Sequence, residues 1–107
     1  MNKILNFLGL CKKAGKLSIG FDAVVKSMEE KRSSLVLVTK DFGANSLKKT
    51  LRKAKLFAVE VLEINETMDD IHTTLGKRCG IISINDIEFS SGIKKLTCDN
   101  LRGNIIL

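Results

Sequence analysis

Residues 35–38 read Leu35-Val36-Leu37-Val38, four apolar residues in succession, two of them β-branched. An apolar run of strand length without polar alternation is typical of a β-strand that is covered on both faces. Residues 81–84, which are apolar except for one serine, have the same character. Strands of this kind occur where helices pack on both sides of a sheet, so these segments predict an α/β domain.

The segments between these strands have helical periodicity. Apolar residues recur there at intervals of three and four, and the whole pattern gives five helices and three or four strands. The predicted helices span residues 2–14, 21–32, 44–56, 67–75 and 85–96. The predicted strands span residues 17–19, 35–38, 57–62 and 81–84, the first of them at an edge. About four strands fit into the sheet of a chain of this length.

Capping residues mark several of these boundaries. Gly15 suits the position just after the first helix. Thr67 and Asp70 have the spacing of a capping box, with Asp in place of the usual Glu. Asn85 or Asp86 caps the last helix.

The chain has 107 residues, no proline and no change of composition that would indicate a linker. We therefore expect a single domain over residues 1–96. The sequence leaves the structure of the tail, residues 97–107, open. The apolar residues Ile105, Ile106 and Leu107 must pack either on this domain or on a partner.

Composition argues against several classes of protein. Three cysteines lie far apart in the sequence with a single histidine, so we expect reduced thiols, no metal site and no cofactor. No apolar run reaches the length of about 18–20 residues that a membrane span needs, and the N-terminus lacks the pattern of a secretion signal. No Ser/His/Asp set or glycine-rich nucleotide loop can be assembled. We expect a cytoplasmic protein that is not an enzyme.

Positive charge is concentrated in the first half of the chain. Residues 1–55 contain thirteen Lys and Arg against four Asp and Glu, a net charge of +9, whereas residues 56–107 have a net charge of −3. This asymmetry is typical of a nucleic-acid-binding protein, although a merely soluble basic protein has a similar composition. Five Phe, no Tyr and no Trp argue against a protein that stacks unpaired bases on aromatic side chains.

The segment from residue 12 to residue 26 places lysines around a glycine-opened helix start. Lys12, Lys13 and Lys16 precede Gly20, and Lys26 follows one turn into the helix. A helix N-terminus has free N–H groups and a partial positive charge, which favour bound phosphate. Gly20 has no Cβ, so a ligand can approach the backbone there. The alternatives are an ordinary loop-to-helix junction and, for the first three lysines, a solvated helix end.

Two further basic features are weaker indications of a ligand. The outer surface of the helix predicted over residues 44–56 is basic, which indicates solvated surface, an extension of the positive field or contact with a second RNA segment. Lys40 follows the strand over residues 35–38, at a strand end where α/β folds place ligands. The basic residues of the helix are Lys48, Lys49, Arg52, Lys53 and Lys55.

Two segments resemble a known family. Residues 20–26 read Gly-Phe-Asp-Ala-Val-Val-Lys, and residues 75–81 read Leu-Gly-Lys-Arg-Cys-Gly-Ile. Together with the α/β alternation, they resemble the superfamily of ribosomal proteins L-seven-Ae, L-thirty-e and S-twelve-e, and within it the short bacterial members of the YlxQ type. The resemblance covers residues 3–96. It implies a three-layer α/β/α sandwich with a central mixed sheet, and binding to kink-turns, which are RNA internal loops with tandem sheared G·A pairs.

The family's recognition helix begins with Gly-x-Asn-Glu-x-x-Lys. Gly20 and Lys26 match this motif, whereas Asp22 stands at the Asn position and Ala23 at the Glu position. Asp accepts hydrogen bonds from guanine but cannot donate, and phosphates repel its charge. We therefore expect binding that is driven more by RNA phosphates than by base reading.

The resemblance implies structured RNA as the partner, either rRNA or a kink-turn-like element, with the ribosome as a candidate site of action and no DNA. The family's second RNA-facing segment is a small apolar loop after the Leu-Gly…Cys-Gly motif; here it is short, because Gly80 leads directly into the strand over residues 81–84, and Lys77 and Arg78 supply charge there instead. The alternative is a protein–protein adaptor that kept the fold and lost most RNA recognition. The oligomeric state is open. The expected RNA-contact residues are Gly20, Phe21, Asp22, Lys26, Lys12, Lys13, Lys16, Lys40, Lys77 and Arg78.

Overall fold

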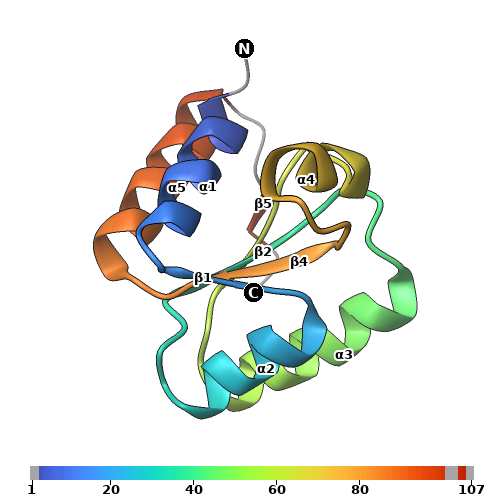
Figure 1. Cartoon of the computed structure of the whole chain (residues 1–107). Coiled ribbons are helices and arrows are strands. Elements are labelled where there is room, and N and C mark those ends of the chain that lie inside the picture. Colours follow the sequence, from blue (N-terminus) through green and yellow to red (C-terminus); the bar gives the residue numbers. More distant parts are fainter. Residues whose placement is uncertain (1–2, 101–103, 106–107) are drawn as a thin grey trace.

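The computed structural model describes the backbone of residues 3–100 and 104–105, and the side chains of residues 3–96. Helices and strands alternate along these residues, as the sequence predicts (Figure 1). The helices are α1 (Lys3–Lys13), α2 (Phe21–Glu29), α3 (Ala44–Leu56), α4 (Met68–Leu75) and α5 (Ile87–Asn100). The strands are β1 (Leu17–Ile19), β2 (Leu35–Val38), β3 (Val61–Glu63), β4 (Ile81–Ile84) and β5 (Asn104–Ile105).

The strands form one mixed sheet in the order β1-β4-β2-β3-β5. β2 and β3 are parallel, and β4 lies antiparallel between β1 and β2. These pairings confirm the α/β class and the edge position of β1. The two-residue strand β5 adds to the four expected strands by pairing Ile105 with Leu62. Ile106, Leu107 and Asn2, the predicted first residue of the first helix, lie outside the described residues.

Helices cover both faces of the sheet (Figure 1). α1, α4 and α5 pack on one face, and α2 and α3 pack on the other. Because side chains alternate along a strand, β2 contributes to both cores. Leu35 and Leu37 face the first group of helices, and Val36 and Val38 face the second. All four are at most 1% exposed, so the apolar run is buried on both sides, as its composition predicts.

The predicted strand over residues 57–62 is wrong in its first part, because α3 ends there in a turn. Phe57 caps the helix, Ala58 adopts a left-handed conformation with φ 56°, and the N–H of Val59 donates to the carbonyl of Ala54. Phe57 and Val59 are apolar because they pack from this turn against the core beneath α2 and α3. The strand itself begins only at Val61.

Two helix ends also differ from the prediction. α2 ends at Glu29 rather than near Arg32, because Lys31 turns the chain with a φ of 59°. α5 continues to Asn100, beyond the expected end near Leu96.

The predicted starts of α4 and α5 are confirmed by their caps. The Thr67 hydroxyl accepts the N–H of Asp70, and the Asp70 carboxylate accepts the N–H of Thr67, which makes a complete capping box. Of the two alternatives for α5, Asp86 is the cap, because its Oδ1 accepts the N–H groups of Glu88 and Phe89.

Four loops meet at one end of the sheet (Figure 1). β1, β2 and β3 end there and β4 begins there, because β4 is antiparallel to β1 and β2. The loops are those between β1 and α2, β2 and α3, β3 and α4, and α4 and β4. This arrangement brings together segments that are far apart in the sequence.

Candidate nucleic-acid interface

The junction between β1 and α2 is built around Gly20. Its N–H donates to the carbonyl of Ile81 at 3.1 Å, which joins the end of β1 to the start of β4. Its backbone angles, φ 96° and ψ 158°, lie in a region that is in practice open only to glycine. No side chain caps α2, so its first N–H groups carry the partial positive charge of the helix end without a side-chain acceptor. The helix start predicted after Gly20 is confirmed.

The first turn of α2 has mixed charge and is accessible. Asp22 and Ala23 are exposed, and Phe21 is half-buried against the core shared by α2 and α3. Lys26 is exposed one turn further on, about 6 Å along the helix axis from Asp22. The negative charge of Asp22 stabilises the helix N-terminus but opposes the approach of phosphate to the same amides.

Lys77, in the loop between α4 and β4, lies against the Gly20 turn. Its Nζ donates to the carbonyl of Ile19 at 3.4 Å, and a Cβ added at Gly20 would be 3.1 Å from the same nitrogen. Lys12, at the end of α1, donates to the carbonyl of Leu75 at the end of α4. The fold therefore brings the Lys77 ammonium to the α2 start, and it brings the Lys12 ammonium to the end of α4, where the loop that carries Lys77 begins.

Arg78 is exposed in the same loop but already has a partner. Its Nε donates to Asp69 Oδ1 at 2.9 Å, and its Nη1 lies 3.7 Å from the sulfur of Met68. The hydrogen bond to Asp69, followed by the charge of that carboxylate, raises the pKa of Arg78. Both side chains are more than half exposed, so the pair contributes little to stability and opens readily. A phosphate would have to compete with Asp69 for this guanidinium.

The loop between β2 and α3 borders the same corner. Lys40 is exposed, and its N–H donates to the carbonyl of Glu66 in the loop before α4. The two carboxylate oxygens of Asp41 lie 3.1 and 3.3 Å from the N–H nitrogen of Met68, at the start of α4. These contacts fix Lys40 beside the loop that leads into α4, and the N–H of Thr39 donates to the carbonyl of Gly80 in the loop that carries Lys77.

Sequence reasoning missed how closely two of these loops pack. A Cβ at Gly80 would lie 2.4 Å from the ring of Phe42 and 3.0 Å from Met68, so only glycine allows this contact. The available signal was a glycine directly before one buried strand and an aromatic residue shortly after another. Gly80 belongs to the family-like segment of residues 75–81, but nothing in that segment or around Phe42 indicates that the two residues touch.

Lys16 is not brought to this end of the sheet. It lies at the opposite end of β1 from Gly20, where its carbonyl accepts the N–H of Asn85 and its Nζ is 3.9 Å from Asp86. Lys13 is exposed in the last turn of α1. The predicted contact residues that the structure brings together are Gly20, Phe21, Asp22 and Lys77, with Lys26 one turn further along α2. Arg78 follows Lys77 in the same loop, Lys12 reaches the end of α4 before that loop, and Lys40 lies beside the loop that leads into α4.

The described cysteine side chains are neutral thiols. Burial raises the pKa of the half-buried Cys79, and smaller effects of the neighbouring backbone and of Lys77 oppose it. Cys11 is fully buried, and burial together with the charge of Asp86 raises its pKa to about 11. A neutral thiol is a poor nucleophile. Neither of these two residues is part of a disulfide.

Within residues 3–96, no group of three or more His, Cys, Asp or Glu is placed to hold a metal ion. His72 is exposed on α4. None of the helices in the described part of the chain is long and apolar enough to cross a bilayer.

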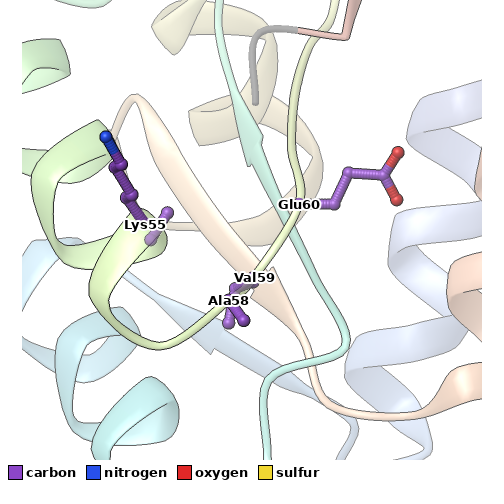
Figure 2. A pocket seen from close by; sticks show the side chains of 5 residues that line it. Lys55, Ala58, Val59 and Glu60 are labelled. Atoms are coloured by element: carbon purple, nitrogen blue, oxygen red, sulfur yellow. The ribbon is translucent and has the colours of Figure 1, made fainter.

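A pocket of about 330 Å³ lies at the far end of α3, beside the start of β3 (Figure 2). Its lining residues are Ala54, Lys55, Ala58, Val59 and Glu60. Figure 2 shows the charged groups of Lys55 and Glu60 pointing away from each other, and Glu60 is paired with Lys94 of α5. The lining has no nucleophile and no converging polar groups, so we assign it no chemistry.

No protein-family model matches the chain. It is similar to two curated proteins named RNA-binding protein YlxQ. The one from Enterococcus faecium is 28% identical over 94 residues, which cover 88% of this chain and 90% of the relative. The one from Bacillus subtilis (strain 168) is 29% identical over 90 residues, which cover 83% and 89%. A solved structure of a protein with unknown function from Bacillus halodurans C has a TM-score of 0.80 at 28% identity, covering 90% of this chain and 97% of that one.

Proposed function

We propose that this protein binds structured RNA in the cytoplasm, with the start of α2 as the central contact. The observation that carries the proposal is the Gly20 turn, where uncapped helix N–H groups and the Lys77 ammonium lie next to each other. Helix N-termini and lysines are groups with which proteins hold phosphate. The similarity to two relatives named RNA-binding protein supports RNA as the polyanion.

A kink-turn or a comparable element of rRNA is the proposed target, and association with the ribosome is part of this proposal. The match of residues 20–26 and 75–81 to the motifs of the L-seven-Ae superfamily supports it. Exposed Asp22 can accept a hydrogen bond from guanine but cannot donate one, and exposed Ala23 makes no polar base contact. Binding therefore depends more on phosphates than on base reading.

The cations around the α2 start differ in their distance from it and in their partners. Lys77 is the proposed inner contact, because its ammonium lies at the Gly20 turn, and Lys12 is the next one, because its ammonium lies at the end of α4, just before the loop that carries Lys77. Lys26 and Lys40 are exposed at the border of this corner. Arg78 joins them after release from Asp69. Lys13 and Lys16 are the outermost of the proposed contacts, and Lys16 is the one furthest from the turn along β1.

Salt titration of binding to a kink-turn RNA tests this function. Phosphate contacts require the logarithm of the affinity to fall linearly with the logarithm of the salt concentration, with a slope of about 0.7–0.9 per contact. Several contacts therefore give a slope of several units. Lys77→Gln should lower the slope of the salt dependence by the amount for one contact, about 0.7–0.9. Lys95→Gln, an equal change of charge at an exposed site on α5, should leave this slope unchanged.

Absence of binding to any structured RNA at low salt would contradict the proposal. The adaptor alternative then gains support if proteins captured by the chain remain bound after ribonuclease treatment. Capture that is lost with ribonuclease is the result expected for the RNA-binding function.

A further inference from the structure

α3 carries a charge excess that the site at the Gly20 turn does not use. Its thirteen residues include five Lys and Arg and no Asp or Glu. All five basic side chains are exposed except Lys53, which is half-buried. They are Lys48, Lys49, Arg52, Lys53 and Lys55.

The fold gives these cations no carboxylate partner among the side chains of residues 3–96. The ion pairs there use basic residues of other segments, namely Lys16, Arg32, Arg78 and Lys94. Like charges four residues apart, such as Lys48 and Arg52, weaken a helix. Lys53 and Lys55 complement the C-terminal end of the helix dipole, but Lys48 and Lys49 are too far from that end to be explained in this way.

The cations form two rows on the side of α3 that faces away from the sheet. The inward side is formed by Leu47, Thr50, Leu51 and Ala54. Lys48, Arg52 and Lys55 recur at intervals of four and three, so they line one row about 10 Å long. Lys49 and Lys53 form a second row beside it. Two parallel rows of this length fit a chain of phosphates better than a single anion.

α3 is also continuous with the proposed RNA site. It packs beside α2 on the same face of the sheet, and both helices begin at the end that holds the Gly20 turn (Figure 1). RNA bound at that turn is therefore close to the start of α3. The helix contains no aromatic residue, so it offers charge without a platform for base stacking.

We propose that α3 is a second RNA-contact surface, which binds the phosphate backbone of a helical stem flanking the element held at the α2 start. This inference rests on the proposed function and adds a location and a kind of contact to it. Because charge alone makes the contact, it is independent of the sequence of the stem.

Two double variants with the same net charge test the inference. Lys48→Gln with Arg52→Gln removes two charges from α3. Lys3→Gln with Lys95→Gln removes two exposed charges from α1 and α5, on the other face of the sheet. The probes are a kink-turn RNA with a long flanking stem and the same RNA with that stem cut short, each titrated by fluorescence anisotropy over a range of salt concentrations.

The α3 variant should bind the long-stem RNA about tenfold or more weakly at about 0.1 M salt, with a slope lowered by about 1.4–1.8. Its binding to the short-stem RNA, and the binding of the control variant to both RNAs, should change much less. Equal circular dichroism and thermal midpoints would show that both variants are folded, as expected for exposed side chains.

Three results would overturn the inference. None of them affects the proposed function as long as the wild-type chain binds RNA. No loss of affinity for the long-stem RNA in the α3 variant would show that this face of α3 is only solvated surface. Equal losses of RNA affinity in the two double variants would show that only the net charge of the protein matters, and not its position on α3. Equal losses on the long and short RNAs would rule out the flanking stem. Failure of the wild-type chain to bind either RNA would instead overturn the proposed function and this inference together.

Discussion

Asp22 has two opposing effects at the start of α2. As an acidic residue in the first turn, it interacts favourably with the partial positive charge of the helix N-terminus. The same charge repels a phosphate that approaches the uncapped N–H groups after Gly20. The residue is exposed, so both effects act on a side chain that is free to reorient. One substitution can separate stability from binding at this position.

Asp22→Asn should therefore strengthen RNA binding and weaken the fold. Loss of the repulsion and gain of an N–H donor should tighten binding to a kink-turn RNA by about 1 kcal/mol, or about fivefold. Loss of the helix-dipole interaction should lower the free energy of unfolding by about 0.3–1 kcal/mol. Binding titration and urea denaturation measure the two effects.

Glu29→Gln is the matched control for this change. It replaces a carboxylate with an amide at an exposed position at the other end of the same helix. It should leave RNA affinity within twofold of the wild type. Affinity that is unchanged or lower in Asp22→Asn would show that this side chain does not face the RNA.

α4 is held at both ends by groups that position the loop carrying Lys77. At its start, Thr67 and Asp70 form the capping box, and the Asp41 carboxylate accepts the N–H of Met68. At its end, the Lys12 ammonium binds the carbonyl of Leu75. The loop to β4 follows directly. The stability of this helix and the geometry of the proposed RNA site are therefore linked.

Thr67→Ala should lower the free energy of unfolding by about 1 kcal/mol, because the N–H of Asp70 loses its acceptor. For a domain of this size, that corresponds to a thermal midpoint lower by about 4–8 °C. Differential scanning calorimetry measures the change. Thr73→Ala, at an exposed position of the same helix, removes a hydroxyl bonded only to the preceding turn and should cost less than about 0.5 kcal/mol. Similar losses in the two variants would contradict the role of the cap.

The described part of the molecule has two cores separated by one sheet, and Cys11 is buried on α1, on one side of that sheet. It is 0% exposed in a helix that packs against α4 and α5. Its burial raises its pKa to about 11, from an ordinary value of 9.0. The raised pKa stabilises the folded state below pH 9, and this stabilisation is lost as the pH rises from about 9 towards 11, because only the unfolded chain then releases the proton.

Labelling of Cys11 should therefore report the unfolding of the whole domain. In a chain with Cys79→Ser and Cys98→Ser, reaction with a disulfide reagent at pH 8 should be at least about a thousandfold slower in native buffer than in urea. Absorbance of the released thiolate gives both rates. Rates within tenfold of each other would show that α1 opens locally.

The distribution of charge over the molecule also follows from the two-faced packing. α3 has five cations and no acid, whereas α4, on the other face, has two Asp and neither Lys nor Arg. The basic first half of the sequence thus contributes a cationic helix to the face shared with α2. The linear sequence shows the excess of charge, and the packing decides on which face of the sheet it lies.

Local patterns in the sequence determined most of the elements of this fold. The apolar run of residues 35–38 predicted a strand buried on both sides, and Thr67 with Asp70 predicted the start of α4, because burial and capping depend on nearby residues. The same reasoning failed at Phe57 and Val59. An apolar residue type is equally compatible with the turn after a helix and with a strand. Only the packing beneath α2 and α3 distinguishes the two cases.

For the proposed site, the sequence by itself determined the Gly20 turn, because its backbone angles demand glycine and the helix pattern begins directly after it. Only the tertiary structure decided which cations lie beside that turn. Lys77 reaches it because β4 is antiparallel to β1, whereas Lys16, only four residues from Gly20, lies at the other end of an extended strand. Strand pairing brings residues that are far apart in the sequence close together in space. A bound phosphate interacts with the cations that are near it in space, whatever their separation in the sequence.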